Sequence, residues 1–280
     1  MNVAIIGGGT MGNGIAQVFA MSGFSVHLVD QKQEFIDKAL ATIQKNLSRM
    51  VAKEKISEED KSSAISHIST HLSVDDFAAE IDLVVEAVPE VKKKKKTVFQ
   101  ELNEKLAGDA IFASNTSSIS IAKLAAISGR PERFIGMHFF NPVPVMKLVE
   151  VVKGLQTSEE VADTILKTSK KLGKTPVPVN DSPGFVSNRV LMPMINEAIF
   201  TVYEGVAEPE HVDEVMKLGM AHPMGPLRLA DFIGLDVCLD ILNVLYEGFK
   251  DPKYRPCPLL VQMVEAGKLG DKSWEGFYEH

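Results

Sequence analysis

The sequence predicts an α/β fold in which a doubly wound, mainly parallel sheet is followed by a second, all-helical domain. Short runs rich in Val and Ile alternate with helical patterns as far as residue 181, which is typical of parallel strands joined by crossover helices. Beyond residue 181 the strand signals stop and helical periods take over. The 280 residues are enough for two ordinary domains, which we expect to span residues 1–181 and 182–280.

The predicted strands are short and almost entirely apolar, as parallel strands covered on both faces should be. They span residues 2–7, 25–30, 82–87, 110–115, 133–139, 148–153 and 175–179. After the second strand, a helical stretch with a long polar face covers residues 32–53, and Ser57 with Asp60 forms a capping-box start for another helix. We interpret this region, about residues 32–66, as inserted helices.

The second domain is predicted from helical periods that are separated by clusters of turn residues. The expected helices span residues 185–204, 209–218, 226–247 and 258–266. Pro226 follows a turn cluster and suits the first position of a helix. No strand is expected in this part of the chain.

Composition places the chain among ordinary globular proteins. Hydrophobic residues make up 45% and charged residues 24% of the sequence, which is far from disordered, collagen-like or membrane-spanning compositions. The net charge of −7 and the pI near 5.6 argue against a general nucleic-acid or acidic-membrane binder, because phosphate backbones favour a basic surface. We therefore expect no nucleic-acid partner and no membrane association.

Targeting signals and cysteine usage predict a cytoplasmic protein. Met1 leads almost at once into an apolar strand, without the charged region and cleavage site of a secretory signal. The apolar run over residues 229–242 is interrupted by three aspartates and is not expected to span a bilayer. Cys238 and Cys257 have no metal-binding spacing, which fits reduced thiols, and we expect no metal site.

A glycine-rich turn follows the first predicted strand and opens a helix. Gly7, Gly9 and Gly12 fit the pattern G-x-G-x-x-G, with Thr10 and Met11 between the last two. In this motif the first glycine permits a tight turn, the second lets the backbone approach a pyrophosphate, and the third lets the helix pack closely on the strand. The helix N-terminus then offers N–H groups and a positive dipole end to phosphates. The context predicts a Rossmann-type dinucleotide site; the alternative is a glycine turn in another βαβ fold.

Asp30 ends the next predicted strand, where a carboxylate can accept hydrogen bonds from both adenosine ribose hydroxyls. A 2′-phosphate at that place would be repelled. Asp30 therefore predicts NAD rather than NADP as the cofactor, although Lys32 two positions later could soften the repulsion.

His138 is the foremost candidate for a catalytic base. It lies at the carboxyl end of an apolar strand, and open α/β sheets bind their ligands outside the carboxyl ends of the strands. Glu150 lies in another apolar strand, and a carboxylate on such a face needs a partner. An imidazole presented by a neighbouring strand would be suitable, since the carboxylate would fix its tautomer. The alternatives are a core histidine with satisfied hydrogen bonds, and a Glu150 paired with Lys147 or Lys153.

Further polar groups stand near the predicted sheet edge and the domain junction. The run over residues 114–118 offers hydroxyl and amide donors, and could equally be a polar loop before a helix capped by Ser120. Asn188 lies in the first turns of a helix, where its poor helix propensity favours a contact role. Most of the lysines in the run 92–96 must be solvated, and at least one could reach a phosphate.

Taken together, these segments resemble the L-3-hydroxyacyl-CoA dehydrogenase family, most closely its short, single-function bacterial branch, the 3-hydroxybutyryl-CoA dehydrogenases. The similarity covers nearly the whole chain, and its long run around His138 and Glu150 is highly specific. The matching segments are residues 7–17, 114–118, 138–150, 183–185, 188–189, 216–219 and 223–226.

The resemblance implies an NAD-dependent oxidation of (S)-3-hydroxyacyl-CoA, with 3-hydroxybutyryl-CoA as the expected short-chain substrate, and the reverse reduction. In the family this reaction serves fatty-acid β-oxidation and butanoate metabolism. By the same resemblance His138 is the general base, Glu150 orients it, and Ser117 and Asn188 bind the substrate oxygen. The implied cofactor contacts outside the glycine turn are Glu90, Lys95, Ser117, Asn141 and Lys272. Acyl-CoA is implied to lie across the cleft between the domains, with Lys53 contacting the CoA.

Two departures from the family pattern concern ligand contacts. Asn46 stands where some members have a CoA-contacting serine, which puts that contact in doubt. Trp274 replaces the first glycine of the C-terminal Lys-Ser/Thr-Gly-x-Gly-Phe-Tyr motif, and if that position has positive φ it costs about 1 kcal/mol or more. The nearby Lys272 contact is then expected to shift.

The helical domain is expected to form a homodimer, as in the family, because it is apolar on more faces than one compact layer can hide. Two rival functions remain open. One is an NAD-dependent dehydrogenase of a small hydroxy acid that does not use CoA. The other is a protein that binds a dinucleotide without turnover, against which the joint presence of His138, Glu150, Ser117 and Asn188 speaks.

Overall fold

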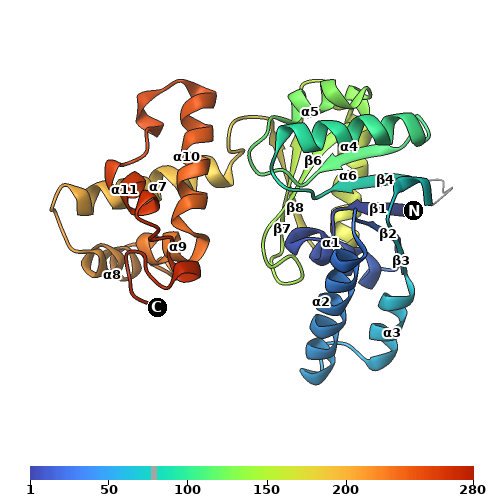
Figure 1. Cartoon of the computed structure of the whole chain (residues 1–280), viewed down its shortest axis with the longest axis horizontal. Coiled ribbons are helices and arrows are strands. Elements are labelled where there is room, and N and C mark those ends of the chain that lie inside the picture. The colour runs from blue at the N-terminus through green and yellow to red at the C-terminus, as the bar shows by residue number, and fades with distance from the viewer. Residues whose placement is uncertain (77–80) are drawn as a thin grey trace. The chain divides into compact units, whose positions relative to one another are not determined.

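A computed structural model describes residues 1–76 and 81–280 of the protein (Figure 1). The chain divides into two compact units, Met1–Asp181 and Ser182–His280. We call them the N-terminal unit and the C-terminal unit and describe each by itself.

The N-terminal unit is built on a single eight-stranded sheet with the strand order β3-β2-β1-β4-β5-β6-β7-β8. Its strands are β1 (Asn2–Ile6), β2 (Ser25–Val29), β3 (Ile68–His71), β4 (Leu83–Glu86), β5 (Ile111–Ser114), β6 (Phe134–Phe139), β7 (Leu148–Lys153) and β8 (Thr175–Asn180). The order reverses direction between β1 and β4, so the sheet is doubly wound, and the predicted fold class is confirmed.

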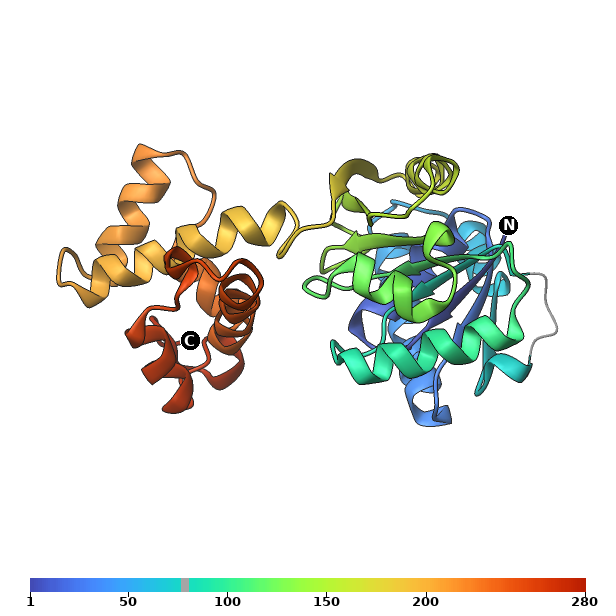
Figure 2. The same cartoon turned by 90° about the horizontal axis from the view of Figure 1, so that it is seen from above.

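Helices cover both faces of this sheet (Figures 1 and 2). They are α1 (Thr10–Met21), α2 (Gln33–Ala52), α3 (Glu58–Ser66), α4 (Lys92–Lys105), α5 (Ile121–Ser128) and α6 (Glu159–Lys171). Along β5, Ala113 joins the core that α1 and α6 share, whereas Phe112 stacks on Phe99 of α4, with ring centroids 5.8 Å apart. Successive side chains of a strand point to opposite faces, so the apolar strands bury both sides at once.

Three features of the sheet differ from the sequence-based expectation. β7 runs antiparallel to β6, because only residues 140–147 join the two strands and a parallel crossover needs a dozen residues or more. β3 was not predicted, since its sequence Ile-Ser-Thr-His is too polar to stand out. β8 lies at the edge with most of its residues exposed or half-buried, and its two prolines suit an edge strand rather than a covered one.

The inserted helices α2 and α3 pack against each other and extend away from the sheet (Figure 1). The predicted capping box opens α3: the Ser57 side chain accepts the Asp60 N–H at 3.0 Å, and the Asp60 carboxylate accepts the Ser57 N–H at 2.9 Å. One apolar stripe of α2, which includes Ile36, Ile43 and Leu47, is buried. The rest of that helix is polar, as expected of a helix that packs on one side only.

The C-terminal unit is helical around its own apolar core. Its helices are α7 (Ser187–Tyr203), α8 (Pro209–Gly219), α9 (Pro226–Ile233), α10 (Leu235–Phe249) and α11 (Pro258–Glu265). The single helix expected over residues 226–247 is wrong, because Gly234 adopts φ +103° and separates α9 from α10. This backbone conformation is open to glycine and ends the first helix.

Candidate active site

The glycine turn between β1 and α1 has the geometry of a phosphate-binding loop. A Cβ atom on Gly7, which has φ +104°, would meet the Ala87 carbonyl oxygen at 2.9 Å, and one on Gly12 would meet the Gly7 oxygen at 1.7 Å. Gly9 differs, because a Cβ there would have nothing within 4 Å and its φ of −62° is ordinary. Packing thus explains Gly7 and Gly12, and the open space over Gly9 suits the close approach of a ligand.

The turn leads directly into α1. Gly9 is the N-cap residue of this helix, no side chain caps it, and its first turn, including Thr10 and Met11, holds no acidic residue. A helix N-terminus of this kind is suited to a phosphate group. The residues present therefore fit the pyrophosphate of a dinucleotide.

Asp30 is held at the end of β2 beside this turn. Its Oδ2 atom accepts the Gly8 N–H at 2.7 Å, and its Oδ1 atom accepts the Gln31 N–H at 2.7 Å. Each carboxylate oxygen keeps a further lone pair for a hydroxyl donor. Lys32 lies over the Phe35 ring, with its Nζ 5.4 Å from the centroid, and pairs with Glu34 at 3.4 Å.

His138 and Glu150 meet across the β6–β7 pair. They are direct register partners, and the His138 Nδ1 atom lies 2.8 Å from the Glu150 Oε2 atom. Both are buried, with exposed fractions of 7% and 2%. The antiparallel turn between β6 and β7 is what brings the two side chains opposite each other, because directly opposed residues share one face of a sheet. The alternative partner Lys153 pairs instead with Glu159, at 2.5 Å.

The surroundings of His138 fix its ring. Phe140 lies against the imidazole, with ring centroids 4.6 Å apart. The Phe139 N–H donates to the Asn115 side chain at 2.9 Å, which ties the end of β6 to the end of β5. A carboxylate on Nδ1 holds the imidazole in one orientation and stabilises a proton gained at Nε2.

The Ser117 turn (residues 116–118) follows β5 and is held by one carboxylate. Glu90 Oε1 accepts the Thr116 hydroxyl at 2.5 Å, the N–H groups of Ser117 and Ser118 at 3.1 Å each, and the Ser118 hydroxyl at 2.8 Å. Burial acts to raise the pKa of Glu90, but the charge of Lys95 and the hydroxyl bonds outweigh it and lower that pKa. Glu90 is therefore an acceptor for the whole turn. Ser120 caps α5, as the sequence analysis expected of a polar loop before a helix.

Lys95, a predicted cofactor contact, is enclosed by acceptor groups of the protein. Unlike the other four lysines of the run 92–96, which are exposed, it is only 1% exposed. Its Nζ atom contacts Glu86 Oε1 at 2.7 Å, Glu90 Oε2 at 3.1 Å and the Val88 carbonyl at 3.2 Å. An ammonium group has three N–H donors, and these three acceptors engage all of them.

Glu86 is a polar residue of this region that the sequence reasoning missed, and its partner Ser114 was noted only as part of the polar run 114–118. Both are fully buried at the ends of β4 and β5, and the Ser114 hydroxyl donates to Glu86 Oε2 at 2.6 Å. Burial raises the pKa of Glu86 against the opposing effect of Lys95. The signal that could have found Glu86 is a carboxylate ending an otherwise apolar strand, which is the reasoning that singled out Glu150.

The remaining predicted ligand residues of the N-terminal unit are accessible. Asn141 is exposed in the loop after β6, and Lys53 is exposed at the C-terminal end of α2. Asn46, which replaces a serine, donates to the Gln17 side chain at 3.3 Å and so turns toward α1.

In the C-terminal unit, Asn188 is the second residue of α7, and its N–H donates to the Gly184 carbonyl at 3.1 Å. Lys272 forms an ion pair with Asp236. Trp274 has φ +65° and is 74% exposed, so the position does have the positive φ at which the family's glycine is favourable.

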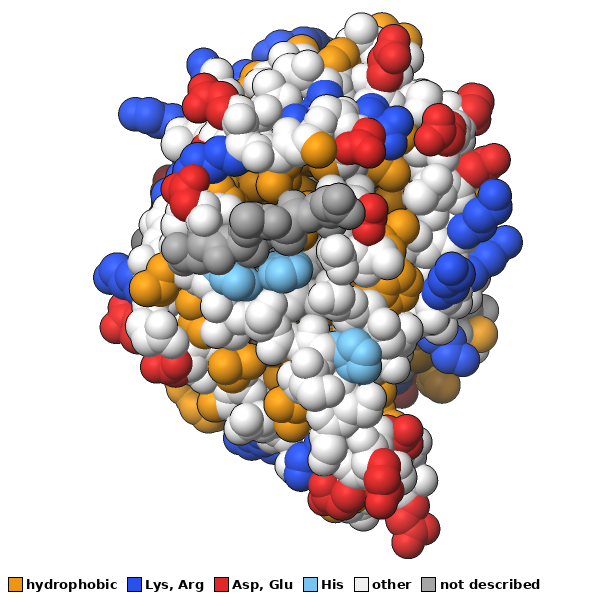
Figure 3. Space-filling model, turned by 90° about the vertical axis from the view of Figure 1, so that its right-hand side faces the viewer, with side chains coloured by type: hydrophobic (Ala, Val, Ile, Leu, Met, Phe, Trp, Pro, Cys, Tyr) orange, Lys and Arg blue, Asp and Glu red, His pale blue; other side chains and the backbone are white. Residues whose placement is uncertain are grey.

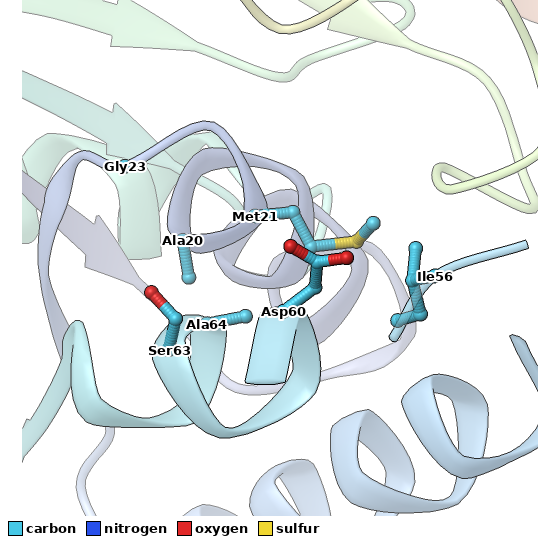
Figure 4. A pocket seen from close by; sticks show the side chains of 7 residues that line it. All are labelled: Ala20, Met21, Gly23, Ile56, Asp60, Ser63 and Ala64. Atoms are coloured by element: carbon cyan, nitrogen blue, oxygen red, sulfur yellow. The ribbon is translucent and has the colours of Figure 1, made fainter. Parts of the chain in front are cut away.

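A cavity of about 300 Å³ lies elsewhere, between the end of α1 and α3 (Figure 4). It is lined by Ala20, Met21, Gly23, Ile56, Asp60, Ser63 and Ala64. None of the predicted site residues lines it, and we assign it no function.

Surface and metal-binding features add little to the site. The face in Figure 3 carries acidic and basic side chains side by side. Among residues 1–76 and 81–280, no group of three or more His, Cys, Asp or Glu side chains is arranged to hold a metal ion. No helix in those ranges has the length and apolar character needed to cross a bilayer.

Comparison with known proteins identifies the family. Residues 2–182 match the family model "3-hydroxyacyl-CoA dehydrogenase, NAD binding domain", and residues 184–280 match "3-hydroxyacyl-CoA dehydrogenase, C-terminal domain". The chain is 56% identical over 280 residues to the "Probable 3-hydroxybutyryl-CoA dehydrogenase" of Deinococcus radiodurans, with 100% of both proteins covered.

Solved structures agree with this assignment. The (S)-3-hydroxybutyryl-CoA dehydrogenase of Ralstonia eutropha matches with a TM-score of 0.97 at 51% identity, over 100% of this chain and 98% of that one. A more distant match, an FHMPC 5-dehydrogenase described as an NAD⁺-dependent dismutase, has a TM-score of 0.80 at 32% identity, over 100% and 90% of the chains. The fold, the NAD-binding domain and the full-length similarity establish that the chain belongs to the 3-hydroxyacyl-CoA dehydrogenase family.

Proposed function

We propose that the protein oxidises short-chain (S)-3-hydroxyacyl-CoA, with 3-hydroxybutyryl-CoA as the expected substrate, and catalyses the reverse reduction. The observation that carries the proposal is the buried 2.8 Å contact between His138 Nδ1 and Glu150 Oε2 at the end of β6. An imidazole held in this way is suited to take a hydroxyl proton near neutral pH.

His138 is proposed to act through its Nε2 atom. It removes the proton of the substrate 3-hydroxyl, and Glu150 stabilises the imidazolium that forms. The glycine turn would hold the pyrophosphate of NAD, which when bound would supply the acceptor for the hydride at C3. In the reverse direction His138 returns the proton to the 3-keto oxygen, so the same pair serves as acid and base.

The other predicted roles are proposals that follow the family resemblance. Ser117 and Asn188 bind the oxygen at C3, and Ser117 also contacts the cofactor. Lys53 contacts the CoA moiety, and its exposure is compatible with this role. Glu90, Asn141 and Lys272 contact the cofactor together with the glycine turn. Lys95 is proposed to contact the cofactor as well, held in place by the carboxylates of Glu86 and Glu90.

A direct assay tests the function. The purified full-length chain is mixed with acetoacetyl-CoA and NADH, and the loss of NADH absorbance is followed, with a series of C4 to C16 3-ketoacyl-CoA substrates to define chain length. We expect turnover that is fastest for the short chains. Binding of NADH without any oxidation would contradict the proposal and support a dinucleotide-binding protein that does not turn over.

A second candidate function is supported by one of the relatives. The FHMPC 5-dehydrogenase shares 32% identity over the whole chain, and its name describes a substrate without CoA. The rival is therefore an NAD-dependent dehydrogenase of a small hydroxy acid. Calorimetric titration with free CoA separates the two, because binding in the micromolar range is expected only of the acyl-CoA enzyme.

We further propose that residues 1–181 serve NAD binding and that residues 182–280 form a homodimer contact. Several large apolar side chains of the C-terminal unit are exposed, including Val190 at 67%, Leu218 at 78% and Phe232 at 62%. Contiguous exposed apolar surface is typical of interaction sites. Sedimentation of the wild type and of Leu218→Glu tests this: a monomeric wild type would contradict the dimer.

A cytoplasmic location is proposed as well. Cys238 and Cys257 are buried free thiols, and burial raises the pKa of Cys238 to about 12, which keeps it protonated and unreactive. Fractionation of the source cells tests this location.

A further inference from the structure

A chain of polar contacts, buried at Glu86, Lys95 and Ser114, leads from β4 to the more exposed Ser117 turn. It starts at Glu86, the last residue of β4, whose register partner is Ser114 at the end of β5. Glu86 accepts the Lys95 ammonium at 2.7 Å and the Val88 N–H at 2.7 Å on one oxygen, and the Ser114 hydroxyl at 2.6 Å on the other. Glu86 is 0% exposed, and its contacts are with groups of the protein.

Two sets of contacts, which we call branches, connect Glu86 to the Ser117 turn. In one, Lys95 also pairs with Glu90 at 3.1 Å, and Glu90 accepts the N–H groups of Ser117 and Ser118. In the other, the hydroxyl of Ser114 accepts the Thr116 N–H at 3.2 Å. The orientation of the turn thus depends on both branches.

Stability alone is a poor explanation for such a cluster. Removing the Glu86 carboxylate and the Lys95 ammonium from water costs several kcal/mol per ion, and well-packed apolar residues of similar volume are often at least as stable. A buried ionic cluster does hold its members in one geometry, because each donor and acceptor is matched. A positional role therefore accounts for the arrangement better than a stabilising one.

We propose that Glu86 is a positioning residue: through Lys95 and Ser114 it sets the direction of the Glu90 carboxylate and the conformation of the Ser117 turn. This inference rests on the proposed function, since it assigns the turn to cofactor and substrate binding. Lys95 is then a link between the Glu86 and Glu90 carboxylates. Glu86 acts without touching substrate, cofactor or His138.

The test is a double-mutant cycle in the full-length protein. Glu86→Gln keeps the shape of the side chain and removes its charge, and Glu90→Gln does the same at the residue through which Glu86 is proposed to act. We expect Glu86→Gln to lower kcat/KM with acetoacetyl-CoA by about 10-fold to 100-fold, the range that a small misplacement of a binding group produces. In the Glu90→Gln background the same change should cost several-fold less, because one of the two branches is already broken and coupled residues are not additive.

A milder variant covers the case in which Glu86→Gln does not fold. Ser114→Ala removes the hydroxyl that joins Glu86 to Thr116, and Ser114→Thr retains a hydroxyl and should restore most of the activity. The matched control is Ser128→Ala in α5: its hydroxyl is equally buried but donates to the Ala125 carbonyl at 2.7 Å, within its own helix. Ser128→Ala should lose thermal stability to a similar extent and keep kcat/KM.

Two results would overturn the proposal. One is a fall in melting temperature with unchanged kcat/KM in the folded Glu86→Gln or Ser114→Ala protein, which means a purely structural role. The other is a Glu86→Gln effect of the same size in both backgrounds. The cycle is also run on the Kd for NADH, measured by fluorescence titration, where the same coupling is expected. If the wild type binds NADH but does not turn over, the proposed function fails while the NADH cycle still decides whether Glu86 positions the turn.

Discussion

The carboxylate of Glu150 lies 2.8 Å from the Nδ1 atom of His138, and both residues are buried at directly opposed positions of β6 and β7. The Nε2 atom of the same ring is therefore the one through which His138 would exchange a proton. This relationship depends on the antiparallel pairing of the two strands. It also makes the role of Glu150 open to a simple test.

Glu150→Gln is expected to lower kcat by about 100-fold to 10,000-fold, because a neutral amide neither stabilises an imidazolium nor enforces one tautomer. The Kd for NADH should stay within about 3-fold of the wild-type value, since three strands of the sheet separate β7, which carries Glu150, from β1, which leads into the glycine turn. Stopped-flow kinetics and fluorescence titration measure the two quantities. A kcat near that of the wild type would remove Glu150 from the catalytic pair.

Asp30→Ala is expected to weaken the use of NADH much more than the use of NADPH. The carboxylate that is held by the N–H groups of Gly8 and Gln31 offers acceptors to ribose hydroxyls and repels a 2′-phosphate. The ratio of kcat/KM for the two cofactors should shift toward NADPH by at least about 10-fold, which corresponds to about 1.4 kcal/mol. Asp37→Ala, on the exposed face of α2, serves as a control with the same loss of charge. Unchanged discrimination in Asp30→Ala would disprove the assignment.

Trp274→Gly is expected to stabilise the C-terminal unit by about 1 kcal/mol, because φ +65° strains a side chain that is 74% exposed and gains little from packing. For a domain of this size the melting temperature should rise by about 4 °C or more. Trp274→Ala is the matched control, since alanine keeps a Cβ at positive φ and should gain much less. Calorimetry of the full chain measures both, and an equal effect of the two variants would argue against backbone strain.

Lys174→Met is expected to loosen the loop that follows His138. The ammonium group is buried and donates to the carbonyls of Val143 and Met146, the latter at 2.8 Å, and burial lowers its pKa. Its removal leaves two carbonyls without this donor, at a cost of about 1–3 kcal/mol in the free energy of unfolding. Urea denaturation measures the loss. Lys171→Met, at the exposed end of α6, provides the comparison, and equal stability of the two variants would refute the expected role.

Much of the fold could be predicted because its signals are local. Strand and helix periods, the capping box at Ser57 and the glycine turn each occupy a short stretch of chain. Where the local signal is weak or misleading the prediction failed: β3 is polar, and the period over residues 226–247 continues through Gly234 although the backbone does not. The positive φ of Gly234 is a property of the folded chain that periodicity alone does not reveal.

The candidate site shows the same division. His138 and Glu150 could be singled out from apolar runs that contain one titratable residue each. Their pairing could not, because pattern alone left Lys147 and Lys153 as equal alternatives for Glu150. Lys95 is the reverse case: a run of lysines gives no sign of which one is buried, and the answer depends on Glu86 and Glu90 from other segments.

The sequence by itself determined which residues can carry chemistry and which elements hold them, because side-chain type, spacing and periodicity are properties of adjacent residues. Tertiary structure alone decided that β7 turns back beside β6, that Glu150 therefore meets His138, and that Lys95 points inward to two carboxylates. These outcomes depend on strand register and on burial. A buried charged group needs a partner, and which partner it meets is set by how separate segments pack together.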